Sequence, residues 1–180
     1  MIARYTRPDM GRIWNEENKF RQWLAVEVAA TETLAEAGIV PRRAARAIRA
    51  KGDFELARIH EIESEVKHDV IAFTTAVAEK VGPESRWLHY GLTSNDVVDT
   101  AQALQLKAAS ELILAGIERL RAMIAQHGAR CDLEVDGGIS AATAPQAVRA
   151  GANVLVAGSA VYADPAGPGA GIATLRAAIG

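Results

Sequence analysis

The 180-residue chain is 49% hydrophobic and 23% charged, with a formal net charge of −2, which fits an ordinary globular protein of one domain or two small ones. No charge excess points to nucleic acid or a membrane surface, and the single cysteine, Cys131, excludes an internal disulfide framework and fits a reducing cytosol. No stretch reaches ~18 apolar residues, and the start MIARYTRPDM lacks a signal-peptide pattern, so we expect a cytoplasmic protein.

Up to about residue 127 the sequence pattern is helical. Apolar residues recur at helical spacing after Pro8, and Gly38 followed by Pro41 indicates an end and a new start. Further helices are predicted in the segments PRRAARAIRAKG, FELARIHEIESEV and HDVIAFTTAVAEKVG. Thr93 to Asp96 fit an N-cap followed by an acidic residue, and they begin a helix that reaches His127. At ~1.5 Å per residue this helix would be roughly 45 Å long, so we expect it to pack against other helices, either of this chain or of other subunits in a homo-oligomer.

After Gly128 the pattern changes to β-α-β-α, the unit of a parallel sheet. A short strand over 133–135 ends at Asp136-Gly137-Gly138, and a helix is predicted in AATAPQAVRAG. A continuous buried strand is predicted over 153–161, running into Gly158-Ser159, before a helical tail. Two parallel strands leave edges unpaired, which favours association.

Polar residues near the predicted helix starts are the candidates for chemistry in the helical part. His68 lies between Lys67 and Asp69, where an imidazole could act as a general acid, but capping or packing at a helix junction is the interpretation that the sequence alone favours. Thr93 and Ser94 could bind a carboxylate or phosphate at a helix N-terminus, and plain capping explains them as well. His60 and His127 are expected to face solvent.

Three segments, RYTRPDMGRIWNEENKFRQWLAVEVA, KHDVIAF and RWLHYGLTSNDVVDTAQALQL, resemble the N-terminal region of adenylosuccinate lyase, in the fumarase/aspartase superfamily, over residues 1 to about 115. The resemblance implies fumarate elimination from adenylosuccinate or the related carboxamide ribotide, in purine biosynthesis and without a cofactor. It places His68 at the reacting centre and implies that the substrate-contacting residues are Arg4, Tyr5, Lys67, His68, Asp69, His89, Thr93 and Ser94.

The family also uses a second histidine as general acid and a Ser-containing loop as general base, and neither occurs in this sequence. Elimination needs both an acid and a base within hydrogen-bond reach, so we expect an incomplete lyase that is inactive alone. The family is a homotetramer whose sites combine residues of three subunits. The expected partner is therefore a phosphorylated, adenylosuccinate-like small molecule, bound by a homo-oligomer, with neither nucleic acid nor membrane involved.

The segment CDLEVDGGISAATAPQAVRAGANVLVAGSAVYADP resembles the C-terminal end of ribulose-phosphate 3-epimerase, a (β/α)8 barrel, over about 117–180. The resemblance implies that Asp136 is a catalytic acid/base and a ligand of a divalent metal. It implies a sugar-phosphate site made of Gly137, Gly138, Gly158 and Ser159. The other metal ligands of that family, two histidines and an aspartate, lie on strands that this sequence does not contain.

The predicted fold is therefore a mainly α, fumarase/aspartase-like region over 1–116, followed by a barrel fragment over 117–180. The joint is expected between Leu112 and Met123, where a single amphipathic helix satisfies both resemblances. Three functions stay open: a lyase-derived protein, an epimerase fragment, and a chimera without catalysis.

Overall fold

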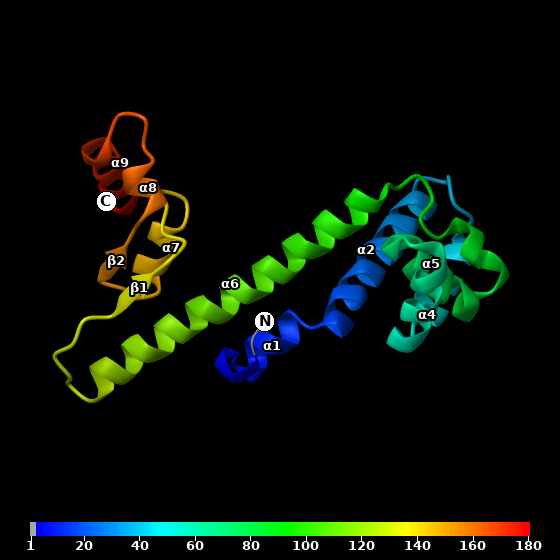
Figure 1. Cartoon of the computed structure of the whole chain (residues 1–180), viewed down its shortest axis with the longest axis horizontal. Helices are drawn as coiled ribbons and strands as arrows, with labels where there is room; N and C mark the ends of the chain where they lie inside the picture. Colours follow the sequence, from blue (N-terminus) through cyan, green and yellow to red (C-terminus); the bar gives the residue numbers. More distant parts are fainter. Residues whose placement is uncertain (1–2) are drawn as a thin grey trace. The chain divides into compact units, whose positions relative to one another are not determined.

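The computed structural model describes residues 3–180, which are mainly helical, as the sequence predicts (Figure 1). The first part contains η1 (Ala3–Tyr5), α1 (Pro8–Ile13), α2 (Glu16–Glu36), α3 (Arg42–Lys51), α4 (Leu56–Val66), α5 (Asp69–Val81), η2 (Pro83–Trp87) and α6 (Ser94–Gln126). After it come β1 (Glu134–Asp136), α7 (Ala144–Arg149), β2 (Val154–Val156), α8 (Ser159–Tyr162) and α9 (Pro168–Ile179).

The chain divides into two compact units, a first unit up to Ala109 and a second unit from Ser110 onward. The division falls inside α6, a continuous helix of 33 residues and therefore about 50 Å in length. This confirms the long helix expected from the sequence, and it begins at Ser94, inside the predicted start from Thr93 to Asp96. Within residues 3–180, no helix has both the length and the apolar character needed to cross a membrane.

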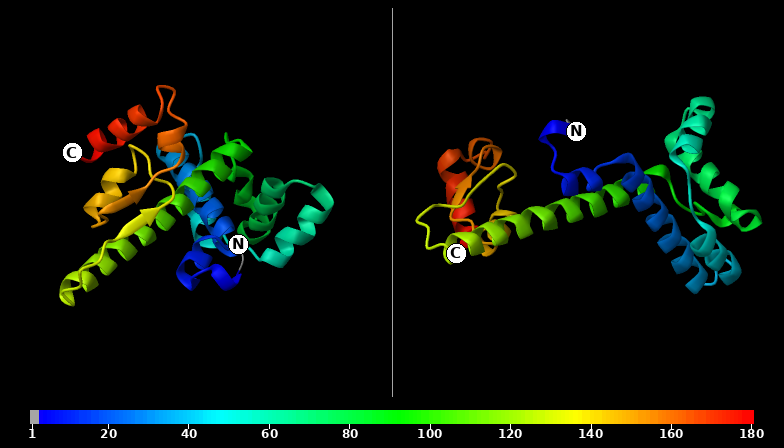
Figure 2. Two further views of the ribbon diagram at one scale, coloured as in Figure 1. Left: turned by 60° about the vertical axis from the view of Figure 1, so that its left-hand side comes forward. Right: turned by 90° about the horizontal axis from the view of Figure 1, so that it is seen from below.

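Aromatic rings form the centre of the core of the first unit. Phe73 of α5 stacks on Phe20 of α2 with ring centroids 5.6 Å apart, and both side chains are buried. Trp23 and Phe54 approach Phe73 edge-on, at 5.5 and 6.0 Å. The buried residues of α2 recur three or four positions apart and so share one face of the helix. This packing fixes α5, and α4 packs against α5 in turn (Figure 2).

Side-chain caps mark two helix starts of this unit. Asn15 precedes α2, and its Oδ1 accepts the backbone N–H of Asn18 at 2.7 Å. His68 precedes α5 in the same way, with its ring accepting the N–H of Ile71. A polar side chain that accepts one of the orphan N–H groups stabilises the first turn, which explains why these helices begin where they do.

A parallel strand pair lies in the second unit, with Val135 of β1 opposite Leu155 of β2 (Figure 1). Its small core joins the strands, α7 and the later part of α6 through the buried residues Ile117, Leu133, Ile139, Ala144, Ala147, Ala150 and Ala152. Gly151 follows α7 with φ +113°, and a Cβ there would lie 2.6 Å from Cγ of Arg121. Only glycine therefore fits at this position.

The long second strand predicted over 153–161 is wrong, because β2 covers Val154–Val156 only. The chain turns at Gly158 and continues as α8, which packs against α9. A short apolar run is equally compatible with a strand and with a buried helical turn, so periodicity did not distinguish them. The order β-α-β-α is present, but the described residues contain two strands, and a barrel fragment stays a prediction.

Candidate functional site

Lys67, His68 and Asp69 form the junction between α4 and α5, and all three are exposed. Lys67 ends α4 in the left-handed conformation, with φ +54°. The His68 Nδ1 atom accepts the backbone N–H of Ile71 at 3.4 Å and lies 3.6 Å from Oδ1 of Asp69. A ring that accepts through Nδ1 carries its proton on Nε2 when it is neutral, so His68 caps the helix and can also donate outward.

A surface hollow of about 410 Å³ lies beside this junction, lined by His60, Glu63, Ser64 and Lys67. Its histidine, His60, is half-exposed, as expected, and its Nε2 lies 3.0 Å from Oε2 of Glu16. Lys67 is therefore the one predicted site residue that lines this hollow, and its ammonium gives the hollow a positive group suited to an anion.

His89 is paired with a buried carboxylate that the sequence analysis did not single out. Glu27 of α2 is 0% exposed, and its Oε2 accepts the backbone N–H of His89 at 2.8 Å. Its Oε1 lies 2.5 Å from the His89 ring atom Nδ1. The signal for this residue lies in QWLAVEV, where an acidic side chain occupies the same helical face as Trp23, Leu24 and Val28.

Thr93 and Asp96 form one half of a capping box at the start of α6, in which the acidic side chain reaches back to the residue before the helix. The carboxylate of Asp96 accepts the backbone N–H of Thr93 at 2.7 Å and its hydroxyl at 2.9 Å. These two hydrogen bonds hold the pKa of Asp96 below its ordinary value, the backbone donor contributing most. The capping interpretation of Thr93 therefore describes the geometry, while the half-buried Ser94 begins the helix itself.

Arg4 and Tyr5 lie exposed in η1, with the Arg4 guanidinium carbon 4.7 Å from the centre of the Tyr5 ring. The candidate residues thus fall into separate groups. His68 stands at the N-terminus of the 13-residue α5, which is about 20 Å long, and the segment leading to His89 begins after its C-terminus. Among the described residues, no hydrogen bond or ion pair joins Lys67, His68 or Asp69 to His89 or Thr93.

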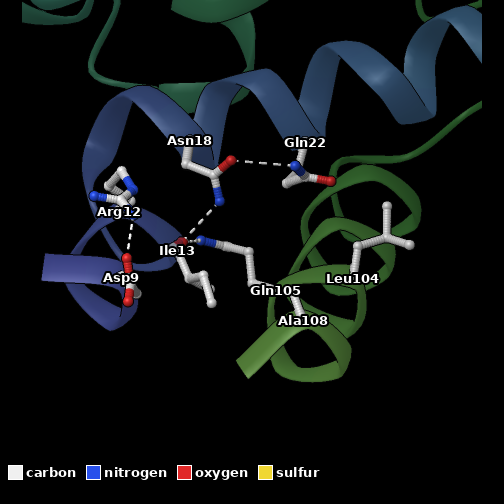
Figure 3. A pocket seen from close by; sticks show the side chains of 8 residues that line it. All are labelled: Asp9, Arg12, Ile13, Asn18, Gln22, Leu104, Gln105 and Ala108. Carbon is white, nitrogen blue, oxygen red and sulfur yellow. Dashed lines mark hydrogen bonds and ion pairs between the residues drawn. The ribbon is translucent and has the colours of Figure 1, made fainter. Parts of the chain in front are cut away.

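A second hollow, of about 340 Å³, contains none of the predicted residues (Figure 3). It is lined by Asp9, Arg12, Ile13, Asn18, Gln22, Leu104, Gln105 and Ala108. The amides of Asn18 and Gln105 both donate to the carbonyl oxygen of Ile13, at 2.8 and 2.7 Å, as Figure 3 shows. Because these amides are used to hold α1, α2 and α6 together, we interpret this hollow as structural.

In the second unit, Asp136 ends β1 as an exposed side chain, and Gly137 and Gly138 follow with φ +97° and +67°. Gly158 and Ser159 lie exposed at the start of the four-residue α8. In the part of the chain that the structure describes, no three His, Cys, Asp or Glu side chains gather as metal ligands would. Asp136 alone does not make a divalent-metal site, so the described residues do not fit the metal that the epimerase resemblance implies.

Solved structures define the class of the first unit. The chain is similar to 3-carboxy-cis,cis-muconate lactonizing enzyme from Pseudomonas putida, with TM-score 0.63 and 28% identity, over 69% of this chain and 30% of that one. It is similar to a fumarate lyase from Mesorhizobium sp. BNC1, with TM-score 0.58 and 26% identity, over 65% and 28% of the two chains. The helical unit therefore has the fold of fumarate-lyase-like proteins.

The family model described as Lyase matches residues 3–131, and the chain belongs to this family. The adenylosuccinate lyase of Bacillus subtilis is 50% identical over 119 residues, 66% of this chain and 28% of that protein. That of Synechocystis sp. is 53% identical over 120 residues, 67% and 28% of the two chains. The chain thus spans less than a third of the length of these relatives.

The model of the Ribulose-phosphate 3 epimerase family matches residues 107–162. This match confirms the resemblance found at the C-terminal end of the sequence. It overlaps the lyase match over residues 107–131, most of which belong to α6.

Proposed function

We propose that the chain acts as an adenylosuccinate-lyase-like protein that binds adenylosuccinate or a related phosphorylated succinyl compound. The proposal is carried by the 50 to 53% identity to adenylosuccinate lyases across the unit that contains Arg4, Lys67, His68, His89 and Thr93. These residues supply cations, imidazoles and a hydroxyl, which suit a substrate rich in carboxylate and phosphate oxygens.

Backbone geometry supports the same proposal. Lys67 and His89 are the two non-glycine residues with positive φ in residues 3–180, and both belong to the predicted substrate-contacting set. A non-glycine residue held in the left-handed region costs on the order of 1–3 kcal/mol and is often found at functional sites. The hydrogen bond from the backbone N–H of His89 to Glu27 maintains the left-handed conformation of His89.

We further propose that the residues described here bind the substrate but do not turn it over without a second copy of the chain. Elimination requires a base beside the carboxylate and an acid at the leaving nitrogen, both within ~3 Å of the reacting atoms. In residues 3–180 no hydrogen bond or ion pair joins His68 to His89, and His68 Nδ1 is engaged in the helix cap. A homo-oligomer in the cytoplasm would bring such groups together from different subunits.

Two measurements on the purified chain test this function. Calorimetry should show adenylosuccinate binding that His68→Ala weakens, while the exposed His127→Ala serves as the matched control. Fumarate release from adenylosuccinate is followed in parallel, and we expect none from dilute chain. A folded protein that binds no adenylosuccinate contradicts the lyase-like function, and turnover by a dilute monomer contradicts the need for a second copy.

Ribulose-phosphate epimerisation is the second candidate, supported by the family match over 107–162 and by Asp136 at the end of β1. The test is epimerisation of ribulose 5-phosphate at carbon 3 with added divalent metal, compared between the wild type and Asp136→Asn. Equal rates with and without the carboxylate would leave this segment as the non-catalytic part of a chimera.

A further inference from the structure

We infer that Glu27 is the positioning residue of His89: it holds a proton on Nδ1 of the ring and leaves Nε2 as the nitrogen that meets a ligand. The ligand part of this inference rests on the proposed function. The protonation part rests on the geometry of the pair alone and is tested separately.

Burial makes Glu27 unusual in this molecule. Among the described residues it is the one charged side chain that is fully buried, the other buried polar residues being Thr31 and Gln105. A buried carboxylate is costly unless each of its oxygens has a strong partner. An apolar residue would fill this face of α2 without that cost, so a local reason for the carboxylate is required.

The pair supplies that reason, because both carboxylate oxygens are used by the same residue. Oε2 accepts the His89 N–H at 2.8 Å, and Oε1 lies 2.5 Å from Nδ1. An ionised carboxylate only accepts hydrogen bonds, so opposite an ionised Glu27 the ring donates from Nδ1. The backbone bond also secures the left-handed conformation of His89, with φ +60°, and therefore the direction in which the ring leaves the chain.

The opposite ring nitrogen is open. The His89 side chain is 27% exposed, and its ring contacts the fully buried Glu27 through Nδ1. In residues 3–180 no buried side-chain nitrogen or oxygen lacks a hydrogen-bond partner. The ring hydrogen bond of His89 is made through Nδ1, so Nε2 is the solvent-facing nitrogen. A carboxylate on one ring nitrogen fixes the tautomer and orientation with which the other acts.

NMR spectroscopy of the histidine rings measures this protonation directly. The chain has four histidines, so the His89 signals are identified as those missing from His89→Gln. Long-range proton–nitrogen correlations distinguish a protonated ring nitrogen from an unprotonated one. We expect Nδ1 of wild-type His89 to carry a proton. An unprotonated Nδ1 overturns the inference, and this measurement requires no variant at position 27 to fold.

Glu27→Gln provides the second readout. Its amide has one acceptor oxygen, so when that oxygen keeps the His89 N–H, its NH₂ group faces Nδ1. We expect the ring proton to move to Nε2 in this variant, and not in Glu36→Gln, an exposed substitution on the same helix. An unchanged His89 ring in folded Glu27→Gln overturns the inference, because a residue with only a packing role would leave the tautomer as it was.

Adenylosuccinate is then titrated into the three proteins. A shift of the His89 signals in the wild type and in Glu36→Gln supports the inference, together with about tenfold weaker binding in Glu27→Gln. This magnitude is the lower end of the loss seen when a metal-binding histidine loses the carboxylate that orients it. Ligand that shifts His68 but not His89 overturns the ligand role of His89 while the proposed function stands. If adenylosuccinate shifts the signals of no histidine, both the proposed function and the ligand role of His89 are overturned. The protonation of the His89 ring still tests whether Glu27 keeps the proton on Nδ1.

Discussion

Two substitutions at His68 separate helix capping from substrate chemistry. Alanine removes the hydrogen bond to Ile71, which at 3.4 Å is long, from a side chain that is 43% exposed. We therefore expect a loss of about 0.5 kcal/mol in the free energy of unfolding, the low end for an N-cap. The contact with Asp69 at 3.6 Å joins two exposed groups and adds at most a few tenths of a kcal/mol. Asparagine is among the best N-cap residues, so His68→Asn should be as stable as the wild type.

Both variants lose the imidazole, so their affinity for adenylosuccinate should fall by the same amount. A hydrogen bond to a charged group contributes about 1.5–3 kcal/mol, which corresponds to roughly 10- to 150-fold in the dissociation constant. Urea denaturation followed by circular dichroism measures the stability, and calorimetry measures the affinity. Wild-type affinity in His68→Asn would refute the reasoning, because capping alone would then account for His68.

Phe73→Ala should destabilise the first unit by about 3–5 kcal/mol, because this fully buried ring contacts three other aromatic rings. Hydrogen exchange should show that the amides of α5 lose protection, and unchanged exchange there would contradict the packing argument. The Asp96 carboxyl should titrate below its ordinary pKa in a carbon-detected NMR titration, and Thr93→Val should raise that pKa part of the way, since the backbone donor remains. Because the pKa of Asp96 is lowered in the folded protein, its hydrogen bonds to Thr93 stabilise the protein above about pH 4, and this contribution is lost as the pH falls through the folded pKa. An unchanged pKa of Asp96 in Thr93→Val would argue against the hydrogen bond from the hydroxyl. Ile113→Glu together with Leu120→Glu should shift sedimentation toward the monomer, because these exposed apolar side chains lie seven positions apart and so on one face of α6. A wild type that is monomeric at all concentrations would disprove self-association through this face.

Most helices of the first unit could be predicted because their signals are local. Gly38 and Pro41 separate α2 from α3, and the Thr93 capping box begins α6. The apolar spacing of α2 also predicted its buried face. Tertiary context decided the second unit instead: the run 153–161 divides between β2 and α8, because Gly158 ends the extended segment and Gly171 lets α9 approach α8 closely.

The candidate site was predictable as a set of residue types, but its pairings were not. His89 and Glu27 are 62 positions apart, and neither periodicity nor a short motif connects them. The one available signal was the acidic residue on the apolar face of α2. Such a residue requires a buried partner, but the sequence alone does not identify which side chain supplies it.

The two family matches meet on α6, and helix physics explains why one chain can satisfy both. An α-helix completes its backbone hydrogen bonds within itself, so the partners of its side chains can change along its length without leaving an unpaired N–H or C=O. Residues before Ala109 pack in the first unit, whereas Leu114, Ile117 and Ile124 pack against the core of the second. Ile113 and Leu120, between and beside those contacts, stay exposed. The surface they form belongs to neither core, and this is why the association experiment is directed at these two residues.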